Sequence, residues 1–161
     1  MPNSALDVAV AALMRDTAEK TLLKHYQKLS IGDITDKAAD DVVTIADTES
    51  EIMLAEGLAK ILPEAAIVGE EAAHADPAIF ERLSDKLCWI IDPLDGTKEF
   101  IARNGQFTVN IALVRDGVPM FGVVYAPVLD EMFWNVPGEG AWLRRAGVTQ
   151  RLRAATQASR V

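Results

Sequence analysis

The chain has 161 residues, of which 50% are hydrophobic and 25% charged, a composition typical of one globular domain of ordinary size. Its 24 acidic and 16 basic residues give a net charge of −8, which argues against non-specific binding to a nucleic acid polymer. The single cysteine excludes an intrachain disulfide and favours a cytoplasmic location, and no apolar run is long enough for a transmembrane segment.

The N-terminal segment, residues 4–29, is predicted to form a long amphipathic helix. Ser4 followed by Asp7 resembles a capping box, and apolar residues recur after it at the spacing of one helical face. Residues 31–43 carry a glycine, four aspartates and little periodicity. We therefore expect them to form a loop after the helix.

A second long helix is expected from Thr44 to about Leu62, where Pro63 ends it. Asp47 lies three residues after Thr44, so the two residues can form a capping box at the positive end of the helix dipole. This structural interpretation explains Asp47 without a catalytic role.

Strand patterns dominate the rest of the chain. We expect a short helix at 77–84, and strands at residues 66–68, 87–91, 107–113, 118–125, 131–136 and about 138–143. Cys88 lies in one of these strands and is expected to be buried. Two helices followed by sequential strands predict an α+β fold, with two long helices packed on a largely antiparallel sheet. The whole chain, residues 1–161, is expected to be a single domain.

The strand predicted at 87–91 is followed by an unusual run, Asp92-Pro93-Leu94-Asp95-Gly96-Thr97. Pro93 fixes its own backbone and biases Asp92 toward extended geometry, and Gly96 permits a sharp turn. We expect a rigid corner at which Asp92, Asp95 and the Leu94 carbonyl face one point. Oxygen ligands of this kind suit Mg²⁺ or a similar hard cation. An ordinary Asx-type turn between a strand and a helix is the alternative explanation.

A second acidic pair, Glu70 and Glu71, follows the strand predicted at 66–68. If the two strands are neighbours, Glu70 lies beside Asp92 and Asp95. Three carboxylates at one spot repel one another strongly unless cations neutralise them. A surface glutamate pair in a loop is the simpler interpretation of these residues on their own.

The run from Ile91 to Thr97, with Gly69-Glu70-Glu71 upstream, resembles the signatures of the inositol monophosphatase family. Members of this family are Mg²⁺-dependent, lithium-sensitive phosphomonoesterases. The resemblance implies a metal-binding domain with the N-terminal half of the family's sugar-phosphatase fold. It also implies a small phosphorylated substrate, Mg²⁺ as the cofactor and inhibition by Li⁺.

The resemblance further implies which residues bind the metal. The implied ligands are the side chains and the one carbonyl of Glu70, Asp92, Leu94 and Asp95. Glu70 also counts among the implied catalytic residues, and Glu71 is given a supporting or structural role. These roles are expectations carried over from the family motifs.

Water activation and substrate binding are implied in the same way. Asp47 is expected to accept a hydrogen bond from Thr97, so that the pair orients and helps to deprotonate the attacking water. Asp95, Gly96 and Thr97 are expected to contact the substrate. Lys37 matches a basic position that precedes the Asp47 motif in the family.

Later segments refine the resemblance within the family. Lys98-Glu99-Phe100 and residues 104–113, 122–127 and 138–141 look more like the 3′(2′),5′-bisphosphate nucleotidase branch than the inositol monophosphatase branch. This branch uses metal-activated water to remove the 3′-phosphate of adenosine 3′,5′-bisphosphate, a by-product of sulfate assimilation, giving AMP and phosphate. The alternatives are an inositol monophosphatase and a non-catalytic metal-binding or regulatory module.

One family feature has no counterpart in this sequence. The family's C-terminal α/β half supplies a further metal-binding aspartate in a Trp-Asp motif, whereas Trp89, Trp134 and Trp142 are followed by Ile, Asn and Leu. We therefore expect the C-terminal half to be absent and this chain to be incomplete for catalysis. We also expect a homo-oligomer, or packing against the missing half, because apolar surface would otherwise be exposed.

Two other groups of residues are interpreted as structural or solvated. His25 and His74 accompany no nucleophile motif. Arginines are frequent near the end of the chain, and we interpret this end as a solvated tail rather than a phosphate site. These arginines are Arg144, Arg145, Arg151, Arg153 and Arg160.

Overall fold

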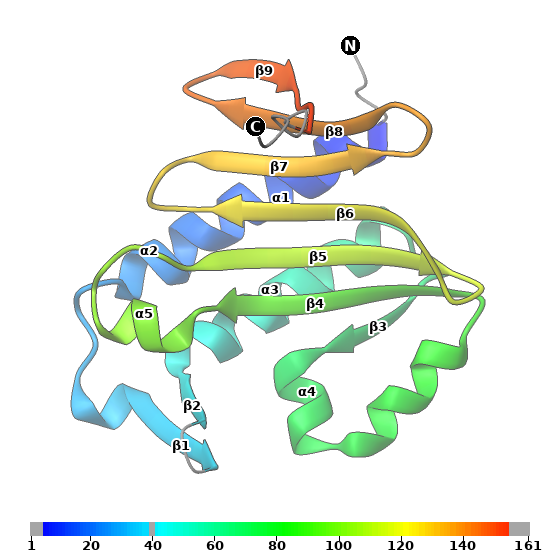
Figure 1. Ribbon diagram of the computed structural model, residues 1–161. Coiled ribbons are helices and arrows are strands. Elements are labelled where there is room, and N and C mark those ends of the chain that lie inside the picture. The colour runs from blue at the N-terminus through cyan, green and yellow to red at the C-terminus, as the bar shows by residue number, and fades with distance from the viewer. Residues whose placement is uncertain (1–4, 39–40, 155–161) are drawn as a thin grey trace, which may run out of the picture.

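A seven-stranded sheet forms the centre of the protein, and the two longest helices cover one of its faces (Figure 1). The computed structural model describes residues 5–38 and 41–154. In spatial order the strands are β3 (Ala66–Gly69), β4 (Leu87–Asp95), β5 (Thr108–Arg115), β6 (Val118–Ala126), β7 (Glu131–Val136), β8 (Gly140–Arg145) and β9 (Val148–Arg151). All neighbours are antiparallel except β3 and β4, which are parallel. The predicted α+β class with a largely antiparallel sheet is confirmed.

The first predicted helix exists but is divided and shorter than expected. It consists of α1 (Ala5–Lys20) and α2 (Leu22–His25). At the break, the Thr21 hydroxyl donates to the carbonyl four residues earlier at 2.7 Å, a bond that often bends helices. The helix ends before Gln27, whose positive φ of 66° is incompatible with a right-handed helix. Ser4, the expected cap, lies outside the described residues.

The second predicted helix is confirmed as α3 (Ile45–Ile61). Thr44 is its N-cap, and Asp47 Oδ2 accepts hydrogen bonds from the Thr44 amide at 2.8 Å and the Thr44 hydroxyl at 2.6 Å. The predicted capping box is therefore present. Leu54 and Leu58 are fully buried, and α3 packs against both β4 and α1.

The predicted loop is wrong for residues 31–38 and 41–43, and residues 39–40 lie outside the described part of the chain. After a short 3₁₀ turn, η1 (Ile31–Asp33), the chain forms an antiparallel pair of strands, β1 (Ile34–Ala38) and β2 (Asp41–Thr44). The β-branched residues of this segment favour extended backbone, and the aspartates between them hid that pattern.

The predicted strands are all present, with two differences. β4 was expected to end at residue 91, but it continues to Asp95. β9 was not predicted, because its residues are all exposed and show no alternation of apolar and polar side chains. The short helices are α4 (Glu70–Ala75), η2 (Pro77–Ser84), which is a 3₁₀ helix, and α5 (Thr97–Ile101).

The two faces of the sheet differ in what covers them. Trp89, Val109 and Val123 belong to the core on the face covered by α1 and α3. On the opposite face, which is toward the viewer in Figure 1, Ile90 and Val124 are 36% and 38% exposed. The expectation of self-association, or of packing against a further half, stays a prediction.

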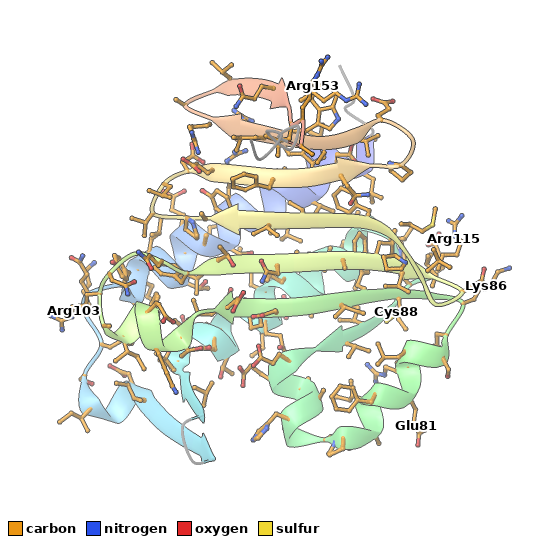
Figure 2. The ribbon with its side chains drawn as sticks, viewed as in Figure 1. Glu81, Lys86, Cys88, Arg103, Arg115 and Arg153 are labelled. Atoms are coloured by element: carbon orange, nitrogen blue, oxygen red, sulfur yellow. The ribbon has the colours of Figure 1, made fainter. Side chains whose placement is uncertain are left out.

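Cys88 is buried, as predicted, at 1% exposure, and Figure 2 labels it on β4. It packs with Val68 and Ala73 in a small cluster where β3 and β4 meet α4. Burial raises the pKa of its thiol, so the reactive thiolate form is disfavoured.

Among the described residues, no helix combines the length and the apolar character that crossing a membrane requires.

Candidate active site

The parallel pairing of β3 and β4 places two acidic segments side by side. Gly69 at the end of β3 lies opposite Ile91 in β4, so the next residues, Glu70 and Asp92, meet at the same end of the two strands. A hydrogen bond joins the Glu70 and Asp92 carboxyl groups, and the Asp95 carboxylate is close enough to repel Asp92. The structure thus brings Glu70 and Asp92 together, with Asp95 near enough to repel Asp92.

The surroundings of Asp92 raise its pKa to about 7. Burial of the carboxyl group is the largest cause, followed by repulsion from Glu70 and from Asp95. The Leu94 amide, which donates to Asp92 Oδ1 at 3.2 Å, acts in the opposite direction. A bound cation would favour the ionised form of such a carboxyl group and relieve the repulsion.

The corner itself is built into the end of β4. The pairing of β4 with β5 is irregular between Asp92 and Asp95, and such a bulge tolerates Pro93, which has no amide to donate. Gly96 then adopts a left-handed conformation with φ 94°, and a Cβ there would lie 2.9 Å from the Gln106 carbonyl oxygen. The predicted sharp turn is confirmed, and α5 begins directly after it.

The predicted hydrogen bond between Thr97 and Asp47 is present. Thr97 Oγ1 lies 3.1 Å from Asp47 Oδ1 and 3.2 Å from the Leu94 carbonyl oxygen, so its one proton can serve either acceptor. Asp47 is 1% exposed, and this burial raises its pKa, although hydrogen bonds from Thr44 and Thr97 oppose the shift. The capping box and the hydrogen bond to Thr97 are therefore compatible, and the role of Asp47 in activating water stays a prediction.

Asn110 and Glu51 contact the site, and neither was predicted from the sequence. Asn110 Nδ2 donates to Asp95 Oδ2 at 3.1 Å, and the Thr108 hydroxyl fixes the amide by donating to Asn110 Oδ1 at 3.1 Å. Glu51 accepts hydrogen bonds from amides at the start of α4. One signal was available, because Glu51 follows Asp47 by one helical turn and so shares its face of α3.

The other residues named from the sequence differ in their burial and contacts. The Leu94 side chain is buried at 2% exposure, so only its carbonyl can serve as a ligand. His25 has a structural contact, with Nε2 2.9 Å from Glu49 Oε2. His74 is exposed in the last turn of α4. Lys37 belongs to β1, and its side chain lies outside the described part of the structure.

The interpretation of the arginine-rich end as a solvated tail needs correction. Arg144 and Arg145 lie in β8, and Arg151 lies in β9, so these residues belong to the sheet. Arg145 also pairs with Glu131 across the strands, with Nε 2.6 Å from Oε1. Arg160 lies outside the described residues.

The donor set of the corner fits a hard cation by its chemistry. Its atoms are the carboxylate oxygens of Glu70, Asp92 and Asp95 and the Leu94 carbonyl oxygen, which are oxygen ligands of the type that Mg²⁺ prefers. Within residues 5–38 and 41–154, however, no three His, Cys, Asp or Glu side chains are already grouped as a ready metal site. The ligand set therefore stays a prediction.

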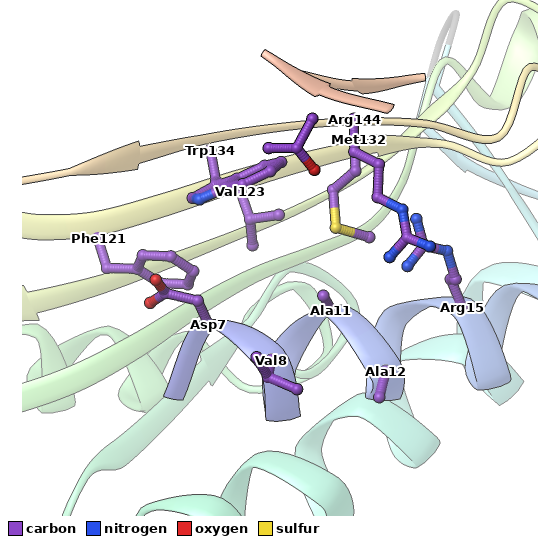
Figure 3. A pocket seen from close by; sticks show the side chains of 11 residues that line it. Asp7, Val8, Ala11, Ala12, Arg15, Phe121, Val123, Met132, Trp134 and Arg144 are labelled. Carbon is purple, nitrogen blue, oxygen red and sulfur yellow. The ribbon is translucent and has the colours of Figure 1, made fainter. Parts of the chain in front are cut away.

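A separate hollow of about 230 Å³ lies between α1 and the strands β6 to β9; Figure 3 shows it from close by. Phe121, Val123 and Trp134 line it from the sheet, and Arg15 approaches it from the helix. Its lining includes none of the predicted site residues. The hollow is therefore not part of the acidic corner.

Comparisons with known proteins place the chain in a family. Residues 3–160 match the model of the inositol monophosphatase family. A 3′(2′),5′-bisphosphate nucleotidase CysQ of Salmonella typhimurium is 40% identical over 144 residues, which are 89% of this chain and 56% of that protein. The chain thus spans about half the length of the curated relatives it matches.

Solved structures agree with this placement. An IMPase of Thermotoga maritima has a TM-score of 0.78 and 31% identity, and the match covers 96% of this chain and 55% of that one. CysQ of Bacteroides thetaiotaomicron has a TM-score of 0.59 and 35% identity, and the match covers 94% and 53% of the two chains. This chain therefore belongs to the inositol monophosphatase family.

Proposed function

We propose that this chain provides the cation-binding and water-activating part of a Mg²⁺-dependent phosphomonoesterase. The proposed reaction removes the 3′-phosphate of adenosine 3′,5′-bisphosphate and gives AMP and phosphate. The observation that carries the proposal is the contact between the Glu70 and Asp92 carboxyl groups, with Asp95 nearby. Two residues after Asp95, Thr97 forms its hydrogen bond with Asp47. The substrate is inferred from the CysQ relative, whose name specifies a bisphosphate nucleotidase.

Mg²⁺ would be held by Glu70, Asp92, Asp95 and the Leu94 carbonyl. When bound there, it would lower the pKa of a water molecule and neutralise charge on the phosphate oxygens and the leaving alkoxide. Burial raises the pKa of Asp92 most, and repulsion from Glu70 and Asp95 raises it further; this repulsion supports the assignment, because the corner is short of positive charge. Li⁺ inhibition is proposed on the family resemblance alone.

Asp47 and Thr97 would hold and move the proton of the attacking water. When Thr97 Oγ1 donates to Asp47 Oδ1, its lone pairs can accept a hydrogen bond from that water. As the water oxygen forms its bond to phosphorus, its proton passes to Thr97 Oγ1 and the threonine proton passes to Asp47. The P–O bond to the ribose then breaks, and the leaving oxygen takes up a proton. Burial raises the pKa of Asp47, which makes it a better proton acceptor.

Asp95, Gly96 and Thr97 are proposed to lie against the substrate. They form the turn between β4 and α5, directly beside the acidic corner. The Asn110 amide holds the Asp95 carboxylate in place at 3.1 Å. Asp95 can therefore keep one orientation toward both the cation and the substrate.

Cation titration tests the first part of the proposal. We expect Asp92→Asn and Glu70→Gln each to weaken Mg²⁺ binding at least about tenfold in calorimetry, because each variant removes a proposed ligand. Glu81→Gln, on the exposed 3₁₀ helix η2, is a control that should leave the affinity unchanged (Figure 2). Unaltered binding in both site variants would refute the cation site.

An inositol monophosphatase is the second candidate. It is favoured by the Thermotoga maritima IMPase, which has a higher TM-score than the Bacteroides CysQ. Phosphate release from adenosine 3′,5′-bisphosphate should be compared with release from inositol 1-phosphate, using this chain together with any further segment that its gene encodes. Faster release from the nucleotide supports the first proposal, and faster release from the inositol phosphate supports the second. Cation binding with release from neither would indicate a non-catalytic module.

A further inference from the structure

Glu51 joins two elements that are far apart in the sequence. Its side chain reaches from α3 to the first turn of α4, where Oε2 accepts from the Glu71 amide at 2.7 Å and Oε1 from the Ala72 amide at 2.8 Å. The residue is 6% exposed, so these bonds lie away from solvent. Amides in the first turn of a helix have no partner within that helix, and a carboxylate is a favourable one.

The cap has to come from another element. α4 starts after Gly69, which has no side chain and gives the helix no cap of its own. A Cβ at Gly69 would overlap the Glu51 carboxyl group, so that carboxyl group lies directly against the backbone at the end of β3. Glu51 therefore holds the chain on both sides of Glu70, at Gly69 by contact and at Glu71 by a hydrogen bond.

The contacts of Glu51 with Gly69, Glu71 and Ala72 affect the acidic corner, because Glu70 is the first residue of α4. Its carboxyl group meets that of Asp92, which β4 holds independently. A shift of the first turn of α4 would move Glu70 away from Asp92 without moving β4. Asp47, one helical turn before Glu51, binds Thr97 from the same helix. One rigid helix thus sets the distance between the water-activating pair and Glu70.

We infer that Glu51 is a positioning residue, which acts through Glu70 to set the cation affinity of the corner. The inference rests on the proposed function, because it assumes that Glu70 and Asp92 share a cation. Glu51 itself is not proposed as a ligand, because both of its oxygens accept hydrogen bonds from the backbone. Outer residues that orient ligands commonly change metal affinity by about 10- to 100-fold when mutated.

The test uses Glu51→Ala and Glu51→Gln in the 161-residue chain. We expect Glu51→Ala to weaken Mg²⁺ binding at least about tenfold in calorimetry, and Glu51→Gln to weaken it less, because glutamine keeps one acceptor oxygen. Amide hydrogen exchange supplies a second readout that needs no cation. Protection of the Glu71 and Ala72 amides should fall in Glu51→Ala and fall less in Glu51→Gln.

Leu58→Ala is the matched control for a general loss of stability. Leu58 lies on the same helix, is fully buried in the core and belongs to no part of the corner. Its truncation should lower the unfolding midpoint while Mg²⁺ affinity stays within about twofold of the original, since a core cavity affects stability first. If Glu51→Ala does not fold, Glu51→Gln provides the same comparison.

The outcomes separate this inference from the proposed function. If Asp92→Asn weakens Mg²⁺ binding and folded Glu51→Ala or Glu51→Gln does not, the positioning role is wrong although the cation site is right. If Asp92→Asn also binds Mg²⁺ normally, the cation site is wrong and the inference falls with it. Weakened binding in the Asp92 and Glu51 variants, with normal binding in Leu58→Ala, supports both.

Discussion

The two ends of the sheet handle charge in opposite ways. At the β7–β8 end, Arg145 and Glu131 form a two-pronged ion pair, with Nε–Oε1 at 2.6 Å and Nη2–Oε2 at 2.9 Å. At the β3–β4 end, Glu70 meets Asp92 carboxyl to carboxyl, and the pKa of Asp92 rises to about 7. Pairing of opposite charges is what stability alone would select. Repulsion built into a rigid corner costs stability, and this cost is typical of a site that binds something positive.

The largest effect is expected on the proposed reaction, measured with this chain together with any further segment that its gene encodes. Thr97→Val removes the hydroxyl that donates to Asp47 but keeps a similar shape. We expect phosphate release to fall about a hundredfold to a thousandfold, because proton transfer by a positioned group is lost. Mg²⁺ affinity should stay within about twofold, since the Thr97 side chain is not a proposed ligand.

Thr149→Val is the control at the other end of the sheet, in the exposed strand β9. It makes the same chemical change far from the corner and should leave phosphate release unaltered. Equal rates in Thr97→Val and Thr149→Val would show that the Thr97–Asp47 pair only caps and supports the fold.

Backbone geometry gives the next largest effect. Gly96 and Gly117 both have positive φ, at 94° and 75°, but only Gly96 is crowded, by the Gln106 carbonyl oxygen. We expect Gly96→Ala to lower the free energy of unfolding by about 2–3 kcal/mol and Gly117→Ala by about 1 kcal/mol, measured by urea denaturation. The difference measures how tightly the corner is built. Equal losses would mean that the corner gives way around an added methyl group.

Asp92→Asn should stabilise the protein when no divalent cation is present. The folded pKa of about 7 lies above the unfolded value of 3.8, so between these values the folded state holds the proton more tightly. The stability contributed by protonated Asp92 is complete below about pH 4 and is lost as the pH rises to about 7. At pH 7.5 we expect the variant to gain about 1–2 kcal/mol, a value discounted for solvent screening.

The sign of this effect can be checked by chemical denaturation at pH 4 and pH 7.5. The difference between the original protein and Asp92→Asn should be near zero at pH 4 and should favour the variant at pH 7.5. Adding Mg²⁺ should then stabilise the original protein more than the variant, since binding to the folded state adds stability. A variant that is less stable at pH 7.5 without cation would show that Asp92 is a structural residue.

The contrast between the ends also shows what the sequence could predict. The capping box of Thr44 and Asp47 depends on residues three positions apart, and the corner depends on the local chemistry of Pro93 and Gly96, so both were predicted. The long strands were predicted because their alternation reflects one buried face. The meeting of Glu70 with Asp92 needed only the assumption that their strands are neighbours.

The remaining features depend on contacts that no local pattern records. The bond from Glu51 to α4 spans 20 positions in the chain, and the Asn110–Asp95 bond depends on the strand register. The pair of strands β1 and β2 was hidden by its aspartates, and β9 pairs with β8 without an apolar face of its own. Tertiary pairing decided these elements, and propensity alone could not.

The smallest effect is expected at the paired end of the sheet. Arg145→Ala removes the guanidinium from Glu131, yet the Arg145 side chain is 58% exposed, so water already screens this pair. We expect the unfolding midpoint to change by no more than about 2 °C in differential scanning calorimetry. The change should shrink further in 0.5 M salt, about the concentration range where exposed ion pairs are screened. The effect of Asp92→Asn should persist in that salt, because its carboxyl group is partly buried among other acids. Arg145→Ala could instead lose more stability than Asp92→Asn gains. The ion pair would then contribute more to stability than the repulsion at the acidic corner costs. That result would reverse the proposed contrast between the two ends of the sheet.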